Sequence, residues 1–143
     1  MTNLFDLTGK IALITGGGGL LGPKHAEAIV EYGGKVILAD WHKDKAKEKA
    51  RLINEKYDKV VAKGVYIDVT DKESIQSVVA GERIDILINN AAKDPKVKKG
   101  GGLTPDSRFE TMTEDYWKEG IDACINGTFL CSQIVSNKML ENG

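Results

Sequence analysis

Short apolar runs alternate along the chain with longer stretches in which apolar residues recur every three or four positions. The runs at residues 11–15, 36–39 and 84–88 are almost continuously apolar, and a further run lies within residues 60–69. Such runs are typical of strands that are buried on both faces of a parallel sheet. We therefore predict four strands.

The segments between these runs have the features of helices. The first lies between Pro23 and Gly33, and helices often begin with proline and end before glycine. Residues 42–57 are rich in Lys, Glu and Ala, with apolar residues at helical spacing. Thr70 and Glu73 resemble a capping box that opens a third, shorter helix.

The segment 93–112 breaks this alternation. It holds several lysines, three consecutive glycines and two prolines, and we predict an irregular loop there. Residues 113–140 then form one long predicted helix. We expect Trp117 to be a core residue. We expect the two cysteines, Cys124 and Cys131, to pack on the sheet or on a partner helix and not to form a redox pair.

Strands that alternate with helices form right-handed β-α-β units in an open parallel sheet. The predicted fold class is therefore α/β, with a Rossmann-like doubly wound sheet of about four strands in the order 3-2-1-4. With no repeat and no linker, we expect residues 1–143 to form a single dinucleotide-binding domain, incomplete at its C-terminus.

A cluster of glycines follows the first predicted strand. Residues 16–19 are all glycine, and Gly22 lies at the start of the next helix. Glycine lets backbone N–H groups approach a phosphate, and the helix N-terminus adds unpaired donors and a positive dipole end. This order predicts a pyrophosphate site. A plain flexible loop is the alternative interpretation.

Asp40 follows the second predicted strand directly. A carboxylate there can accept hydrogen bonds from both ribose hydroxyls of an adenosine, although an ordinary strand-end aspartate is the alternative. A 2′-phosphate beside it would meet repulsion of roughly 1–4 kcal/mol per charge pair. No Arg or Lys lies inside the glycine motif to offset this repulsion, and Lys43 is close but one turn into the next predicted helix. We therefore predict NAD as the cofactor in preference to NADP. The ring of Trp41 could lie against the face of the adenine, or it could be a half-buried packing residue; the sequence leaves both open.

These residues resemble the short-chain dehydrogenase/reductase family. Thr15-Gly16 and Leu21-Gly22 resemble its TGxxxGxG motif, and Asp40 resembles the acid of its NAD-preferring members. Asp68-Val69 resembles the pair whose Asp meets the adenine amino group, and Asn89-Asn90-Ala91 resembles the NNAG motif. The segment WKEGIDACINGTFLCSQ resembles the helix beside the family's active site. Motifs and resemblance together give the candidate cofactor-binding residues Thr15, Gly16, Gly17, Gly18, Gly19, Leu21, Gly22, Asp40, Trp41, Asp68, Val69, Asn90, Ala91 and Ala92.

The sequence departs from the family pattern at several positions. Leu20 stands where the second motif glycine is expected, Ala92 ends the NNAG-like motif, and Cys124 stands where the family has an active-site Asn. The family's catalysis also uses a Ser and a Tyr-x-x-x-Lys pair. None of the four tyrosines has a lysine four residues later. We therefore assign no catalytic residue and expect the chain to be a truncated, cofactor-binding portion that is inactive alone.

Composition excludes several other classes. The net charge is −1, from 20 basic and 21 acidic residues, which argues against a nucleic-acid partner. No apolar run approaches the roughly 18 residues that cross a membrane, and no secretory signal is apparent. The two cysteines lack metal-ligand spacing, so we expect no metal, reduced thiols and a cytoplasmic location.

Three functions are compatible with these observations. The first is the NAD(H)-binding part of an oxidoreductase that transfers hydride to or from a carbonyl or alcohol of a small molecule. The second is a non-catalytic nucleotide-binding module. The third is a structural or interaction remnant. Whichever function holds, one edge of the predicted fourth strand has no neighbouring strand, and the predicted helix 113–140 has no neighbouring helix. We therefore predict self-association, or a homo-oligomer formed through that helix.

Overall fold

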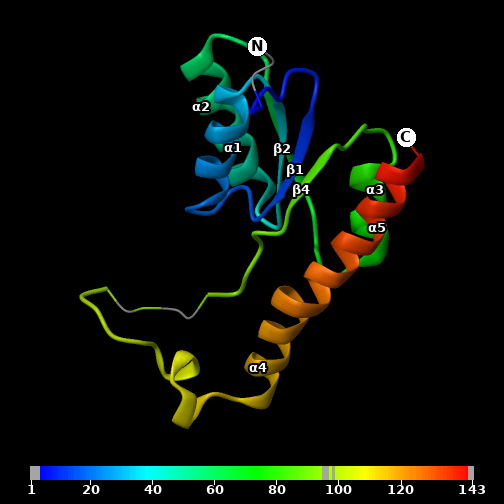
Figure 1. The fold of residues 1–143 in the computed structure, drawn as a ribbon. Coiled ribbons are helices and arrows are strands. Elements are labelled where there is room, and N and C mark those ends of the chain that lie inside the picture. The colour runs from blue at the N-terminus through cyan, green and yellow to red at the C-terminus, as the bar shows by residue number, and fades with distance from the viewer. Residues whose placement is uncertain (1–3, 95–96, 98, 142–143) are drawn as a thin grey trace.

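The computed structural model describes residues 4–94, 97 and 99–141. Its centre is a sheet of four parallel strands, β1 (Ile11–Thr15), β2 (Lys35–Asp40), β3 (Ala62–Tyr66) and β4 (Ile86–Ile88). The strand order is β3-β2-β1-β4 (Figure 1). This confirms the predicted fold class and strand order.

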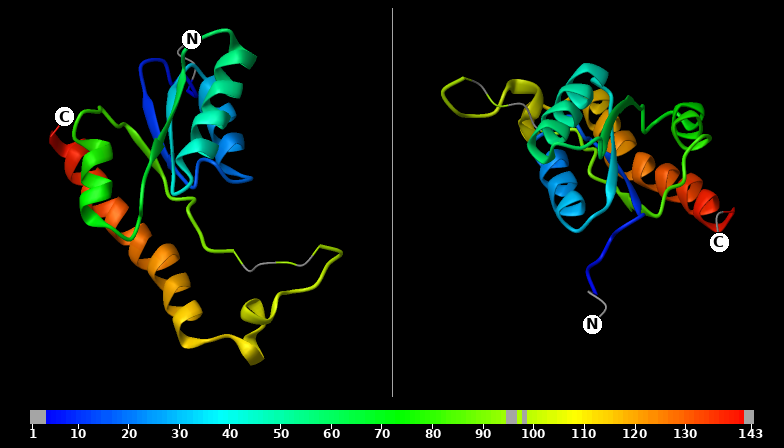
Figure 2. Two further views of the ribbon diagram at one scale, coloured as in Figure 1. Left: turned by 180° about the vertical axis from the view of Figure 1, so that it is seen from behind. Right: turned by 90° about the horizontal axis from the view of Figure 1, so that it is seen from above.

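Helices cover both faces of the sheet. On one face lie α1 (Gly22–Glu31) and α2 (Lys43–Tyr57), and on the other lie α3 (Lys72–Val79) and α5 (Gly127–Glu141) (Figure 2). Successive strand side chains point to opposite faces, so Ile14 belongs to the core under α1 and α2, whereas Leu13 belongs to the core under α3 and α5. Both side chains are fully buried.

The predicted long helix is present but is not uniform. It consists of α4 (Glu114–Ile121), a wider π-helical turn at Asp122–Asn126, and α5. Only α5 packs on the sheet and α3, whereas α4 continues past the strand ends (Figure 1). The expected core position is therefore wrong for Trp117, which is 57% exposed. Cys131 is buried in the core under α3 and α5, whereas Cys124 is exposed and does not pack on the sheet.

The predicted loop at 93–112 leaves the sheet after β4 and joins α4 away from the main body (Figure 1). It contains an antiparallel bridge between Val97 and Leu103 and two single turns of 3₁₀ helix, Pro105–Ser107 and Phe109–Thr111. Ser107 is buried, and its hydroxyl lies 3.0 Å from that of Thr104 and 3.2 Å from that of Tyr116. These contacts hold the loop against α4.

Some element boundaries differ from the prediction. Asp71, and not Thr70, caps α3, because its side chain accepts a hydrogen bond from the Glu73 N–H at 3.0 Å. Thr70 instead donates its N–H and its hydroxyl to the Asp68 carboxylate. Strands β3 and β4 are also shorter than the apolar runs that predicted them.

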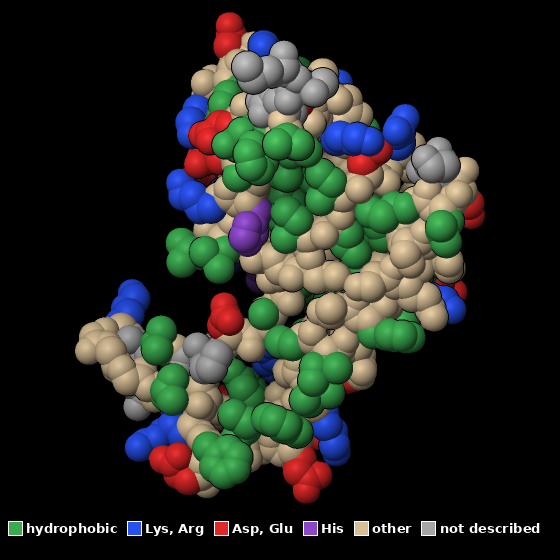
Figure 3. Space-filling model, in the orientation of Figure 1, with side chains coloured by type: hydrophobic (Ala, Val, Ile, Leu, Met, Phe, Trp, Pro, Cys, Tyr) green, Lys and Arg blue, Asp and Glu red, His purple; other side chains and the backbone are tan. Residues whose placement is uncertain are grey.

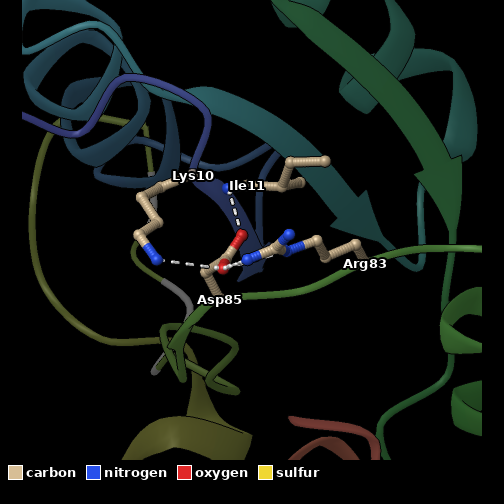
Figure 4. Close-up of polar contacts among 4 residues, drawn as sticks. All are labelled: Lys10, Ile11, Arg83 and Asp85. Atoms are coloured by element: carbon tan, nitrogen blue, oxygen red, sulfur yellow. Dashed lines mark hydrogen bonds and ion pairs between the residues drawn. The ribbon is translucent and has the colours of Figure 1, made fainter. Parts of the chain in front are cut away.

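Asp85 joins the amino-terminal ends of β1 and β4 (Figure 4). Its carboxylate accepts the Ile11 N–H at 3.0 Å and contacts Lys10 at 3.3 Å and Arg83 at 3.1 Å. Burial alone would raise the pKa of the Asp85 carboxyl, but these three donors outweigh it and hold the pKa below its ordinary value. The interaction fixes the sheet at the end opposite the predicted site.

Helix α2 packs very closely on β3. A Cβ added to Gly64 would overlap the backbone of Ala46 and Lys47 in α2. Next to this contact, the Asn54 side chain accepts the N–H groups of Val61 and Ala62 and donates to the Ala62 carbonyl, each at 2.8 Å. β3 is an edge strand, and Ala62 is its first residue. Asn54 thereby makes the hydrogen bonds that a further strand would otherwise make with Ala62.

Candidate functional site

A cavity of about 960 Å³ lies at the carboxyl ends of the strands. In open parallel sheets, ligands bind outside these strand ends, at the point where the strand order reverses. Here that point lies between β1 and β4. Figure 3 shows the molecule hollowed at this level, between the main body and the lobe formed by α4 and the preceding loop.

Most predicted cofactor-binding residues line this cavity, and four do not. The predicted residues that line it are Gly16, Gly19, Leu21, Asp40, Trp41, Asp68, Val69, Asn90, Ala91 and Ala92. The remaining four, Thr15, Gly17, Gly18 and Gly22, are buried beneath its floor and shape the loop.

The glycine loop depends on two close approaches. Gly16 has a φ of +66°, and a Cβ there would come within 2.9 Å of the Asn90 side-chain nitrogen. A Cβ on Gly22 would lie 2.6 Å from the Gly16 carbonyl oxygen, so the start of α1 folds directly onto the loop. No side chain caps α1 at Leu21. Pro23 has no N–H, and the N–H groups of Lys24 and His25 both donate to the Leu21 carbonyl. What this turn offers an external anion is therefore mainly the positive end of the helix dipole.

Thr15 and Asn90 connect β1 to the segment after β4. Thr15 is 1% exposed, and its hydroxyl oxygen accepts the N–H groups of Asn90 and Ala91, each at 3.0 Å. The Asn90 side chain in turn donates to the Thr15 carbonyl at 3.0 Å and the Gly16 carbonyl at 3.2 Å. The predicted residue Thr15 thus holds the site's backbone and has no surface in the cavity.

Asp40 lies at the end of β2, partly buried. One carboxylate oxygen accepts the Gly18 N–H at 2.9 Å, and the other accepts the His42 N–H at 2.8 Å. Each oxygen therefore retains acceptor capacity for a ligand hydroxyl. Beside it, the exposed Trp41 ring contacts the Tyr66 ring, with centroids 6.1 Å apart.

The far wall of the cavity comes from the loop after β4 and from the long helix. Lys93 forms an ion pair with Glu119, and its ammonium lies 4.1 Å from the centre of the Tyr116 ring. The Lys93 N–H also lies 3.5 Å from the sulfur of Cys124. Cys124 therefore faces the segment after β4, although its side chain does not line the cavity.

Sequence reasoning missed eight residues that line the cavity. Glu119 and Ala123 are four residues apart on the long helix, so a helical-face analysis of that segment was the one signal that pointed to them. Of the others, Leu20 lies within the glycine motif where the family has a glycine, and the remaining residues lie within two positions of predicted ones. The eight are Leu20, His42, Ile67, Thr70, Lys93, Asp94, Glu119 and Ala123.

The described part of the chain offers neither a metal site nor a membrane span. Within residues 4–94 and 99–141, no group of three or more His, Cys, Asp or Glu side chains is placed to hold a metal ion. No helix in the described part of the chain is long and apolar enough to cross a membrane.

Comparison with known proteins gives consistent matches. A sequence profile described as short chain dehydrogenase matches residues 10–143. The chain is 32% identical to an NAD-dependent glycerol dehydrogenase from Listeria innocua, over 97% of this chain and 51% of that protein. It is 32% identical to an acetoacetyl-CoA reductase from Acinetobacter, over 92% of this chain and 51% of that protein.

Solved structures give the same result. A short-chain type dehydrogenase/reductase from Mycobacterium marinum superposes with a TM-score of 0.81 at 29% identity, over 97% of this chain and 53% of that one. A 3-ketoacyl-(acyl-carrier-protein) reductase from Brucella melitensis, complexed with NADH, superposes with a TM-score of 0.77 at 24% identity, which shows the fold alone, over 96% of this chain and 52% of that one. The chain spans about half the length of the relatives it matches.

Proposed function

Because the chain belongs to the short chain dehydrogenase family, we propose that its cavity binds a nicotinamide adenine dinucleotide, with NAD preferred over NADP. The observation that carries the proposal is the junction of the glycine loop with Asp40, where the Asp40 carboxylate accepts the Gly18 N–H at 2.9 Å. This junction brings a phosphate-binding turn and a ribose-binding carboxylate to the same end of one cavity.

The glycine loop and the uncapped start of α1 would hold the pyrophosphate. Gly16 and Gly19 line the cavity, and neither carries a Cβ that would keep a phosphate from the backbone. The loop leads into the first turn of α1, where the positive end of the helix dipole lies. Anion binding at this point needs no cationic side chain.

Asp40 would accept the hydroxyls of the adenine ribose and would disfavour NADP. It is held by two backbone N–H groups, so it cannot easily turn away from a 2′-phosphate. The repulsion is about 1–4 kcal/mol for each charge pair at contact distance. Asp68 and Val69 line the next part of the cavity, where the family resemblance implies the adenine, and Trp41 offers an exposed ring beside them.

The proposal extends to hydride transfer only where the protein also contains the family's Ser and Tyr-x-x-x-Lys pair. The family's chemistry moves hydride between nicotinamide and a carbonyl or alcohol carbon of a small molecule. It uses a Ser and a Tyr-x-x-x-Lys pair, and no tyrosine here has that lysine. The presence of Cys124 at the position of the family's Asn favours a second candidate, a nucleotide-binding module without catalysis.

The long helix would provide a self-association surface. Trp117, Ile125 and Phe129 are 57%, 58% and 60% exposed, and Figure 3 shows apolar side chains gathered over this lobe. Exposed apolar groups of this size favour a protein partner, and we propose a second copy of the chain. A cytoplasmic location, with both cysteines as free thiols, is also part of the proposal.

Titration with NADH tests the proposal. Energy transfer from Trp41 and Trp117 to bound NADH should saturate, and Trp41→Phe should identify the donor beside the adenine end. Asp40→Ala should weaken binding, whereas Asp40→Asn, which keeps one acceptor oxygen for the loop, should weaken it less. Absence of saturable NADH binding, or equal affinity for NADH and NADPH, would contradict the proposal.

A further inference from the structure

The outer edge of β3 is one end of the four-stranded sheet. In a parallel pair of strands, the backbone groups of alternate residues point toward the partner strand. The Ile67 N–H donates to the Asp40 carbonyl at 3.1 Å, which fits a register in which the odd-numbered residues of β3 face β2. The even-numbered residues Ala62, Gly64 and Tyr66 therefore direct their N–H and carbonyl groups to the outer side.

Of these three residues, Ala62 already has a partner on the outer side. The Asn54 side chain accepts the Ala62 N–H and donates to the Ala62 carbonyl, each at 2.8 Å. Gly64 and Tyr66 form no outward backbone hydrogen bond with any residue that the structure describes. Gly64 is partly buried, and Tyr66 is 43% exposed. The edge thus keeps the N–H and carbonyl groups of two alternate residues for a further extended chain.

A groove of about 560 Å³ lies beside this edge, between α2 and β3. Its charged lining residues are Lys47, Arg51, Lys59, Lys63, Glu55 and Asp58. With four cations and two anions, the groove has a formal charge of +2, whereas the whole chain has −1. Arg51 and Lys63 form ion pairs with glutamates. Within the described part of the chain, Lys47 and Lys59 form none.

We propose that this edge binds an extended acidic peptide of a partner protein, which adds a strand to β3 and places carboxylates beside Lys47 and Lys59. Hydrogen bonds to the backbone of Gly64 and Tyr66 supply affinity, and the two ammonium groups select the acidic side chains. Successive side chains of a strand point to opposite faces, so every second residue of the peptide faces the groove. The groove and the cofactor cavity share no lining residue, so the inference does not rest on the proposed function.

Charge favours an acidic partner over a second copy of the chain. Two β3 edges paired with each other would bring two grooves of charge +2 together, and like charges at short distance repel. The exposed Lys63 on the edge strand itself opposes pairing with a neutral or basic strand. An acidic peptide removes both penalties.

Fluorescence anisotropy with labelled peptides tests the role of charge. The probe is a capped peptide in which glutamate alternates with valine, and its control has glutamine in place of each glutamate. The probe should bind saturably, and Lys47→Ala/Lys59→Ala should weaken it by about two- to thirtyfold, the range for losing two exposed ion pairs. Lys47→Arg/Lys59→Arg should retain binding. The matched control is Lys43→Ala/Lys49→Ala, which removes two cations of α2 outside the groove and should change the affinity by less than about twofold.

Amide hydrogen exchange separates strand addition from attraction by charge alone. With the probe at about ten times its Kd, exchange of the Gly64 and Tyr66 N–H groups should slow by about tenfold. Exchange of the Ala62 N–H should change less, because this group already donates to Asn54. A probe with proline in place of its central valine lacks one N–H and should bind more weakly and protect less.

Four results would overturn the inference. They are no saturable binding of the probe, equal binding of the glutamate and glutamine peptides, saturable binding without protection of Gly64 and Tyr66, and protection of these groups that rises with protein concentration without peptide. The last would identify a second copy as the occupant. Circular dichroism establishes that each variant is folded. NADH binding should be the same in both alanine double variants, because none of the four lysines lines the cavity.

Discussion

Thr15→Val should destabilise the protein although the two side chains have nearly the same shape. The Thr15 hydroxyl is the shared acceptor for the N–H groups of Asn90 and Ala91, both at 3.0 Å, in a residue that is 1% exposed. Valine fills the same space but leaves both N–H groups without a partner. An unsatisfied buried donor costs about 1–3 kcal/mol.

Because Asn90 and Ala91 are themselves only partly buried, the lower half of that range applies to each donor. We therefore expect a loss of about 2–4 kcal/mol in the free energy of unfolding. This is a large fraction of the 5–15 kcal/mol that is typical of a domain. The same change should weaken NADH binding, since Asn90 and Ala91 line the cavity.

Urea denaturation followed by circular dichroism measures the change. With a slope of about 1–3 kcal/mol per molar urea, the midpoint should fall by about 1 M or more. Thr15→Ser is the matched control, because it keeps the hydroxyl and removes one methyl group, for a loss of about 1 kcal/mol. If Thr15→Val were as stable as Thr15→Ser, the two hydrogen bonds would not hold the segment after β4, and the reasoning would be refuted.

Two further predictions concern the scaffold. Gly64→Ala should prevent α2 from packing on β3, because the new methyl group would overlap the backbone of Lys47; thermal melting should show a much larger loss than Gly81→Ala, where a Cβ meets no atom within 4 Å. Asp85→Asn should destabilise the protein near neutral pH, but the difference from wild type should shrink in acid. The folded-state pKa of Asp85 lies below its ordinary value of 3.8, so its contribution is present above that pH and disappears as the pH falls through the lower, folded-state value. A difference in unfolding free energy that stayed constant from pH 7 to pH 2 would contradict this account.

The sequence determined the local elements and their order. Strand and helix periodicities reflect which faces of each element are buried, and these periods are written in neighbouring residues. The four apolar runs therefore predicted β1 to β4, and their alternation with helices predicted the order β3-β2-β1-β4. The glycines after β1 and Asp40 at the end of β2 were found for the same reason, since chain position alone carries both to one edge of the sheet.

The tertiary structure decided which residues meet across long separations. Thr15 was predicted as a cofactor-binding residue, but its hydroxyl is used by Asn90, 75 positions away. Trp117 has the spacing of a packing residue, yet it is exposed because α4 continues past the strand ends. Cys124, in the π-helical turn that follows α4, is exposed as well.

The close packing of Gly64 on α2 and the pairing of Lys93 with Glu119 likewise leave no local pattern. A periodic pattern reports that a residue is buried or exposed, whereas its partner depends on how separate elements pack. The sequence therefore determined the scaffold and the place of the site, and packing between distant elements decided which side chains form its walls and hold its backbone.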